Sequence, residues 1–185
     1  MSRVWAVLLA AAAVVALAAC GGSSNDAAPP TTTRSPTAFT YKPGEGPSVS
    51  AKMVCAPEAQ QEIAATLGVK TTAGVVGQWN APVYSCTYRY ANGSFGLSVR
   101  ELADVPTAGR DFKTVSAQYA AKKSDANLGQ GTSQAANGTV VVVKDNKVLV
   151  VNASGLPAKF GQPVLSRSDA ALSVAVVIMG CWTGA

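Results

Sequence analysis

The chain has 185 residues, of which 48% are hydrophobic and 14% are charged, and its net charge is +5. It contains no histidine, which excludes a Ser-His-Asp triad, a Cys-His pair, a histidine-ligated zinc site and a histidine pH switch. The composition also excludes collagen and a wholly disordered chain, and the length favours about one domain.

The N-terminus carries a targeting segment. Arg3 precedes an apolar run over residues 5–16, a pattern typical of a secretory signal, and the run ends in Leu-Ala-Ala-Cys at residues 17–20. These four residues resemble a bacterial lipobox, which implies a signal peptide over residues 1–19, cleavage before Cys20 and lipidation of Cys20. The alternatives are an ordinary signal peptide or an uncleaved transmembrane helix, although residues 4–19 are short for a span of about 20 residues.

Residues 20–50 are expected to form a tether behind the lipidated Cys20. This stretch is rich in Gly, Ser, Thr and Pro and lacks apolar periodicity, so it cannot bury enough surface to fold. Its Thr and Pro clusters are compatible with O-linked sugars, but a bare linker is favoured. We therefore expect a protein anchored to the cell membrane on its extracytoplasmic face, where disulfides are allowed.

Residues 51–185 are expected to form one globular domain. Residues 57–67 predict a helix, because Pro57 lies in its first turn and Gly68 follows its last apolar residue. Residues 83–90 alternate and predict a strand, and Asn92-Gly93 predicts a two-residue hairpin turn. That turn pairs Tyr90 with Phe95, Tyr88 with Leu97 and Cys86 with Val99, with the large side chains on one face.

The second half of the domain predicts a second helix, a meander and a last helix. The second helix covers residues 106–123, and the strands of the meander cover residues 132–136, 139–144 and 147–152. The uninterrupted valines 140–143 predict a strand that is covered on both faces. Ser166 or Ser168 is placed to cap the last helix, which runs to about Trp182, although the valine content of this segment also suits a strand. The expected fold is α+β, an antiparallel sheet of about five strands with about three packed helices.

Three cysteines follow Cys20, and an odd number permits at most one intramolecular disulfide among them. Cys55 lies at the start of the first helix and Cys86 on the core face of the first strand, which favours the pair Cys55–Cys86. Cys181 is the rival partner for either cysteine. Three cysteines without a C-x-x-C pair do not predict a metal site, and we expect no metal and no cofactor.

Few residues outside the cysteines point to chemistry. The chain lacks the common nucleophile and phosphate-loop motifs, and its neighbouring carboxylates are better explained as solvated surface than as a glycosidase pair: Glu58 with Glu62, and Glu101 with Asp104. A tyrosine stripe over residues 84–90 is typical of a core, with a ligand pocket as the alternative. The lysines and arginines are dispersed, so no nucleic-acid partner is expected, although mild attraction to anionic lipid is compatible with them.

Four runs carry a resemblance to a family: residues 53–59 (MVCAPEA), 84–90 (YSCTYRY), 97–102 (LSVREL) and 177–184 (VIMGCWTG). Together with the lipobox and the tether, they resemble small actinobacterial lipoproteins of unknown function. More loosely, they are similar to mycobacterial extracellular domains with an α/β sandwich. The resemblance implies an envelope location and a disulfide, and it assigns no role to any residue.

These observations favour a non-enzymatic, lipid-anchored protein of the cell envelope. Its expected partners are the membrane, through Cys20, and an envelope protein, glycan or lipid. A carrier of an apolar ligand is the alternative, and an enzyme that uses carboxylates alone is less favoured.

Overall fold

A seven-stranded antiparallel sheet runs through residues 46–183, the part of the chain that the computed structural model describes. These residues belong to one of the two units into which the chain divides, Thr31–Ala185. The predictions for the signal peptide 1–19, for Cys20 and for the tether as far as residue 45 lie outside the described residues.

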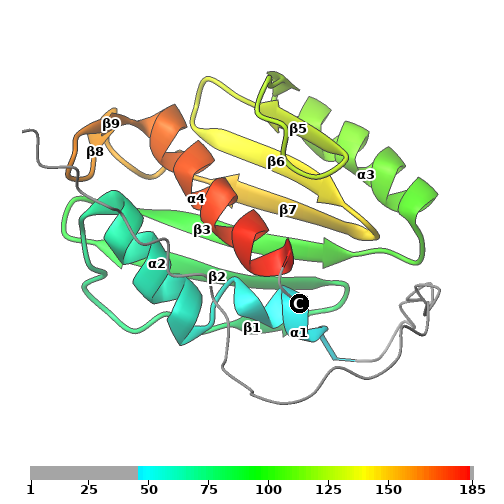
Figure 1. Ribbon diagram of the computed structural model, residues 1–185, viewed down its shortest axis with the longest axis horizontal. Helices are drawn as coiled ribbons and strands as arrows, with labels where there is room; N and C mark the ends of the chain where they lie inside the picture. Colours follow the sequence, from blue (N-terminus) through cyan, green and yellow to red (C-terminus); the bar gives the residue numbers. More distant parts are fainter. Residues whose placement is uncertain (1–45, 184–185) are drawn as a thin grey trace, which may run out of the picture. The chain divides into compact units, whose positions relative to one another are not determined.

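The described elements follow one another as α1 (Val49–Met53), α2 (Pro57–Leu67), β1 (Gln78–Asn80), β2 (Val83–Tyr90), β3 (Gly93–Glu101), α3 (Val105–Gln118), β4 (Lys122–Lys123), β5 (Gly131–Gln134), β6 (Thr139–Lys144), β7 (Lys147–Asn152), β8 (Lys159–Phe160), β9 (Leu165–Ser166) and α4 (Arg167–Thr183). The large sheet has the order β1-β2-β3-β7-β6-β5-β4, and β8 and β9 form a separate hairpin. Helices α1, α2 and α4 pack on one face of the sheet and α3 packs on the other (Figure 1).

The predicted class, α+β with an antiparallel sheet, is confirmed, but the number of strands is larger than the five predicted. The additional strands β1, β4, β8 and β9 have only two or three residues each. Segments this short carry no measurable periodicity, so the hydrophobic pattern cannot reveal them. The fourth helix, α1, has five residues and begins at Val49, behind the cap residue Ser48.

The predicted hairpin between β2 and β3 forms, but its predicted register is wrong by two residues. Tyr90 pairs with Gly93, Tyr88 with Phe95 and Cys86 with Leu97, so the turn is formed by residues 91–92. At Gly93 an added Cβ would lie 2.5 Å from the carbonyl oxygen of Gly155. This close approach leaves no room for a side chain at position 93. Because the shift in register is even, the large side chains keep their face.

The second predicted helix ends earlier than expected. It was predicted to reach Lys123, but α3 ends at Gln118, and Ala120 takes the left-handed conformation with a φ of 50°. The chain then turns back, and residues 122–123 form strand β4 at the edge of the sheet. An alanine gives no signal for such a turn, which usually contains glycine.

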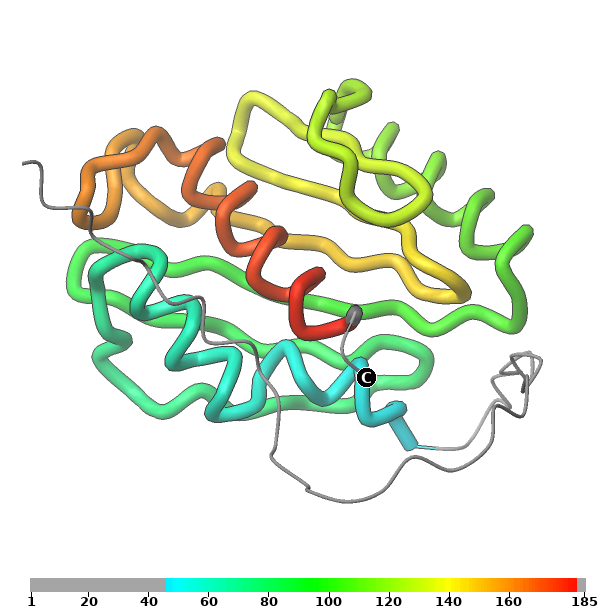
Figure 2. Tube along the Cα trace, viewed as in Figure 1, coloured from blue at the N-terminus to red at the C-terminus, as the bar shows by residue number. Residues whose placement is uncertain are grey.

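The meander and the last helix form as predicted. Strands β5, β6 and β7 are joined in sequence order, and every residue of the valine run 140–143 is buried (Figure 2). Ser166 caps the start of α4. Its Oγ accepts the Asp169 N–H at 3.1 Å, and its hydroxyl donates to the Asp169 carboxylate at 2.6 Å. This reciprocal pair satisfies a backbone donor at the helix start.

The tyrosine stripe belongs to the core, as the sequence favoured. The Tyr88 side chain is fully buried, its ring stacks on Phe95 with centroids 4.7 Å apart, and its hydroxyl donates to the Val54 carbonyl at 2.7 Å. Tyr90 packs edge-on against Phe160. Within residues 46–183, no helix combines the length and the apolar character needed to cross a bilayer.

Candidate functional site

The disulfide joins the start of α2 to the middle of β2. Cys55 and Cys86 are bonded, with their Cα atoms 6.0 Å apart, which confirms the favoured pairing. Cys181 lies near the end of α4, is partly buried and takes no part in this bond. Among the described residues, no group of three His, Cys, Asp or Glu side chains is arranged to hold a metal ion.

The carboxylates considered for catalysis differ in their surroundings, and the prediction that they form solvated surface is wrong for Glu101. Glu101 is 1% exposed at the end of β3, where its Oε2 accepts the Ser48 N–H at 2.9 Å. Asp104 caps α3 by accepting the Thr107 N–H at 2.7 Å, and hydrogen bonding by Thr107 lowers the pKa of Asp104. Glu58 and Glu62 are exposed on α2. None of these positions places two carboxylates across a cleft.

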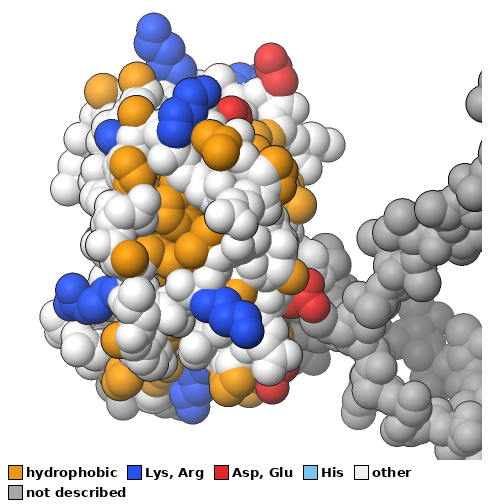
Figure 3. All heavy atoms as spheres, turned by 90° about the vertical axis from the view of Figure 1, so that its left-hand side faces the viewer, with side chains coloured by type: hydrophobic (Ala, Val, Ile, Leu, Met, Phe, Trp, Pro, Cys, Tyr) orange, Lys and Arg blue, Asp and Glu red, His pale blue; other side chains and the backbone are white. Residues whose placement is uncertain are grey.

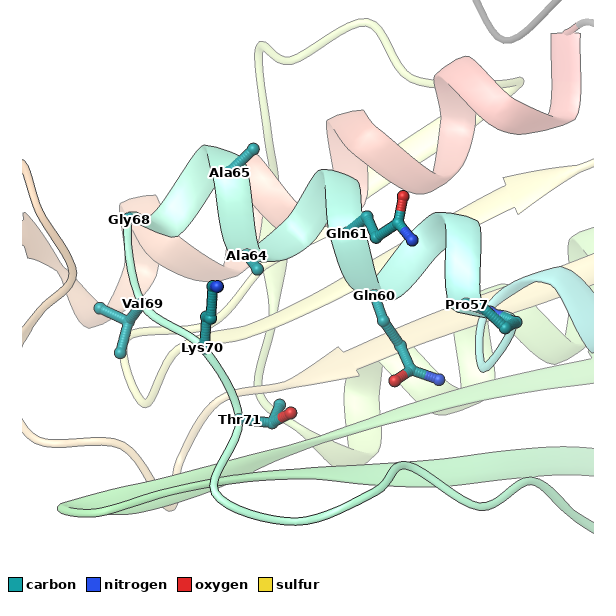
Figure 4. A pocket seen from close by; sticks show the side chains of 9 residues that line it. All are labelled: Pro57, Gln60, Gln61, Ala64, Ala65, Gly68, Val69, Lys70 and Thr71. Carbon is teal, nitrogen blue, oxygen red and sulfur yellow. The ribbon is translucent and has the colours of Figure 1, made fainter.

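A groove of 690 Å³ lies between the outer side of α2 and the segment that follows the helix (Figure 4). We call it the α2 groove. Its lining residues are Pro57, Gln60, Gln61, Ala64, Ala65, Gly68, Val69, Lys70 and Thr71. The first six recur every three or four residues and therefore form one stripe along the helix.

The arrangement of side chains around α2 explains why a groove lies beside this stripe. Ala59, Ile63 and Leu67 are fully buried against the sheet, so the lining residues lie on a different side of the helix. Ala64 and Ala65 have short side chains, which leave space beside the helix. The helix ends at Gly68, and the following residues run back along its outer side (Figure 4).

Polar groups from both walls meet in the α2 groove. The Gln60 side-chain N–H donates to the Cys55 carbonyl at 2.8 Å, which fixes the amide and turns its oxygen toward the hydroxyl of Thr71 (Figure 4). The Lys70 ammonium group lies beside α2 near Ala64 in the same view. The two sides of the groove therefore offer an amide, a hydroxyl and an ammonium group beside the small apolar side chains of Ala64 and Ala65. The lining contains no carboxylate and no thiol.

An apolar patch lies on the surface near the end of α2, next to the α2 groove. Where α2 ends and the hairpin β8–β9 lies, hydrophobic side chains gather in a patch with both basic and acidic side chains around it (Figure 3). Val164, in the turn of this hairpin, is 67% exposed. The Gln162 N–H donates to the Leu67 carbonyl at 2.7 Å, which joins the hairpin to the end of α2 and hence to the end of the α2 groove.

The lining of the α2 groove was not identified from the sequence. Its residues are polar or small and lie on the outward side of an amphipathic helix, where such residues normally contact only water. The available signal was the run of small residues at Ala64 and Ala65 beside two glutamines, and it is weak without the returning segment 69–71.

No protein-family model, curated protein or solved structure matches the chain. The resemblance to actinobacterial lipoproteins therefore stays a prediction.

Proposed function

We propose that this chain is a non-enzymatic, lipid-anchored binding protein of the cell envelope, and that the α2 groove holds an extended polypeptide segment of another envelope protein. The observation that carries this proposal is the groove itself, with hydrogen-bonding groups from both sides, the small side chains of Ala64 and Ala65, and a lining that contains no carboxylate and no thiol. Its volume of 690 Å³ falls within the range of about 300–1,000 Å³ typical of ligand sites.

A polypeptide matches the groove better than a glycan. The glutamine amides and the Thr71 hydroxyl are neutral groups that both donate and accept, as peptide N–H and C=O groups require. The alanine floor suits small apolar side chains, and the lining contains no aromatic ring on which a sugar face would stack. A segment leaving the groove past Gly68 would meet the apolar patch at the β8–β9 end.

The alternative of an apolar-ligand carrier gains no support from the tyrosine and valine side chains that motivated it. Tyr88 is covered by α1 and hydrogen-bonded to Val54, and the valines of β6 pack against helices on both faces. The surface of α2 is therefore the better candidate.

The anchoring part of the proposal rests on Cys20 and the lipobox resemblance, and the disulfide Cys55–Cys86 supports an oxidising location. Its test is labelling with a radioactive fatty acid in an actinobacterial host. We expect the full chain to incorporate the label and the Cys20→Ser variant to lose it. A labelled Cys20→Ser variant, or an unlabelled full chain, would remove the lipid anchor from the proposal.

The groove is tested by photo-crosslinking in the membrane-anchored full chain. A photoreactive residue at Gln61, in the groove, is compared with one at Gln118, an exposed glutamine on α3 on the other face of the sheet. We expect a protease-sensitive adduct from position 61 and none from position 118. Adding Ala64→Arg, which fills the groove, should abolish the adduct while the circular dichroism spectrum stays unchanged.

Two results would contradict the polypeptide proposal. One is an adduct at position 61 that resists protease, which would indicate a glycan or a lipid. The other is an adduct of unchanged yield in the Ala64→Arg variant, which would show that the partner does not occupy the groove.

A further inference from the structure

A second hollow, of 480 Å³, lies on the opposite face of the sheet, between α3 and the edge strands β4 and β5. Its lining residues are Phe112, Lys113, Ser116, Ala117, Ala121, Lys123, Gln130, Gly131, Thr132 and Ser133. From this lining we infer a binding site for a phosphate group carried by a small organic molecule or a lipid headgroup. We call it the α3 hollow, and neither its position nor its ligand depends on the α2 groove.

The sheet register and the helix repeat bring the polar groups of the α3 hollow together. Strand β4 pairs Lys123 with Ser133 on β5, and the Ser133 and Ser116 hydroxyl oxygens lie 2.6 Å apart. On α3, Phe112 and Lys113 lie one turn before Ser116 and so share its side of the helix. Two lysines from separate elements therefore flank one pair of serines.

The charge of the lining suits an anion. Lys113 and Lys123 contribute two positive charges, and no carboxylate belongs to the lining. Two acids outside the lining each have a partner. The Asp145 carboxylate accepts from the Gln130 side-chain amide at 3.4 Å, and one oxygen of the Asp111 carboxylate forms an ion pair with Arg100 at 3.5 Å. Lysine binds phosphate as a compact point charge.

The serine pair supplies a directed donor. Ser116 and Ser133 are 8% and 3% exposed, and the bond between them uses one of their two hydroxyl protons. The second proton is left to donate, and a phosphate oxygen in the hollow is a suitable acceptor. Such a donor at the floor distinguishes the hollow from two lysines on an open surface.

The end of α3 is built so that it repels an anion less than a helix C-terminus normally does. Unsatisfied carbonyls give that terminus a partial negative charge. Here the Tyr119 N–H donates to the Val115 carbonyl, the Ala120 N–H to the Ala117 carbonyl and the Ala121 N–H to the Ser116 carbonyl. The left-handed Ala120 makes these return bonds possible, and the same turn carries Lys123 back beside Ser133.

Phe112 and Gly131 shape the part of the hollow that would hold carbon atoms. A Cβ added at Gly131 would lie 3.3 Å from the Phe112 ring and 3.2 Å from Val143, so the glycine lets the ring approach the backbone of β5 closely. The ring offers an apolar face to the organic part of a phosphate ester. A volume of 480 Å³ is of the size that binds a phosphorylated sugar or glycerol.

The test uses the secreted chain from residue 20 with Cys20→Ser, kept oxidised, and sn-glycerol 3-phosphate as the probe. Binding is followed by phosphorus NMR at constant ionic strength. We expect saturable binding that weakens about five-fold for Lys113→Gln or Lys123→Gln and about twenty-five-fold for both, at about 1 kcal/mol per surface lysine. The matched control is Lys52→Gln with Lys159→Gln, two exposed lysines outside the hollow, and it should bind as the parent does.

A second variant separates binding from charge alone. Ser116→Ala removes one hydroxyl of the pair without changing charge, and we expect it also to weaken binding, with circular dichroism confirming the fold. Equal binding by the parent and the Lys113/Lys123 double variant would overturn the inference. An equal loss in the control pair would do so too, because it would show general attraction to a basic protein.

Vesicle flotation identifies the source of the phosphate. Phosphatidylglycerol vesicles are compared with phosphatidylcholine vesicles, using the same chain and the same variants. Flotation with phosphatidylglycerol that depends on Lys113 and Lys123 would assign the hollow to a lipid headgroup. Binding of sn-glycerol 3-phosphate without flotation would assign it to a soluble phosphate ester.

Discussion

The sheet face toward α3 is built in two halves that differ in chemistry. On β6 and β7 this face carries four valines, at positions 141, 143, 148 and 150, which α3 covers, and it ends in the polar pair Thr139 and Asn152. On the adjoining strands β2 and β3, the same face carries Ser85, Ser98 and Arg100 together with Val83, and none of the helices within residues 46–183 covers it (Figure 1). The boundary is sharp, because Ser98 is paired with Val150 and Arg100 with Val148.

The difference shows that side-chain polarity decides where a helix packs on a continuous sheet. The covered half is held from both faces, whereas the open half is held only from the face of α1, α2 and α4. Its attachments there are the disulfide from Cys86, the hydroxyl of Tyr88 and the packing of Phe95 and Leu97. The open half should therefore depend more on those attachments.

The largest expected effect comes from removing the disulfide. The Cys55→Ala/Cys86→Ala variant opens a link between residues 31 apart, which should lower the free energy of unfolding by about 3–4 kcal/mol. Hydrogen exchange should accelerate more in β2 than in β6, since β6 keeps helices on both faces. Cys181→Ala is the control, and an equal acceleration of both strands would contradict the proposed dependence.

Exchanging the chemistry of the two halves should have unequal effects. Val141→Ser places a serine, as found on the open half, beneath α3. Because apolar burial is lost and a hydroxyl is buried, the free energy of unfolding measured in urea should fall by about 3 kcal/mol. Ser98→Val makes the reverse change on the open half and should stay within about 0.5 kcal/mol of the parent. Similar losses for both variants would show that the halves are not distinct.

Tyr88 should make the protein lose stability at alkaline pH. Burial, with a smaller contribution from Tyr90, raises the pKa of Tyr88 above its ordinary value of 10.0. Above pH 10 the unfolded chain loses this proton first. Deprotonation lowers the free energy of the unfolded state relative to the fold, so stability falls as pH rises.

Tyr88→Phe tests both roles of the hydroxyl. Losing its hydrogen bond to Val54 should cost about 1–2 kcal/mol at neutral pH. The variant should also show a shallower alkaline decline when urea unfolding is compared at pH 8 and pH 10.5. A decline identical to that of the parent would show that Tyr88 does not cause it.

The smallest expected effect lies at the end of α3, in the covered half. Ala120→Gly relieves the left-handed backbone conformation and should raise the free energy of unfolding by about 0.5–1 kcal/mol. The gain should appear as slower hydrogen exchange in α3 and β5, with β2 unchanged. A destabilised variant would mean that the Ala120 methyl group makes contacts worth more than the strain.

Local signals predicted some boundaries closely and failed at others for identifiable reasons. The helix over residues 57–67 was predicted to the residue, because Pro57 and Gly68 mark its ends in the sequence itself. The register of the first hairpin was predicted wrongly, because the Asn92-Gly93 motif predicts a turn at these two residues, whereas Gly93 lies in β3 against the carbonyl of Gly155. The favoured cysteine pair was found because a helix start and a strand face were both readable locally.

By itself, the sequence determined the α+β class, the core face of the first hairpin and the buried valine strand, because each depends on the spacing of residues near one another in the chain. It favoured the disulfide Cys55–Cys86 but left Cys181 as a rival partner. Only the tertiary structure decided the hairpin register, the early end of α3, the short edge strands and both hollows. Each of these depends on contacts between segments distant in sequence: Gly93 with Gly155, β4 with β5, and α3 with the edge of the sheet.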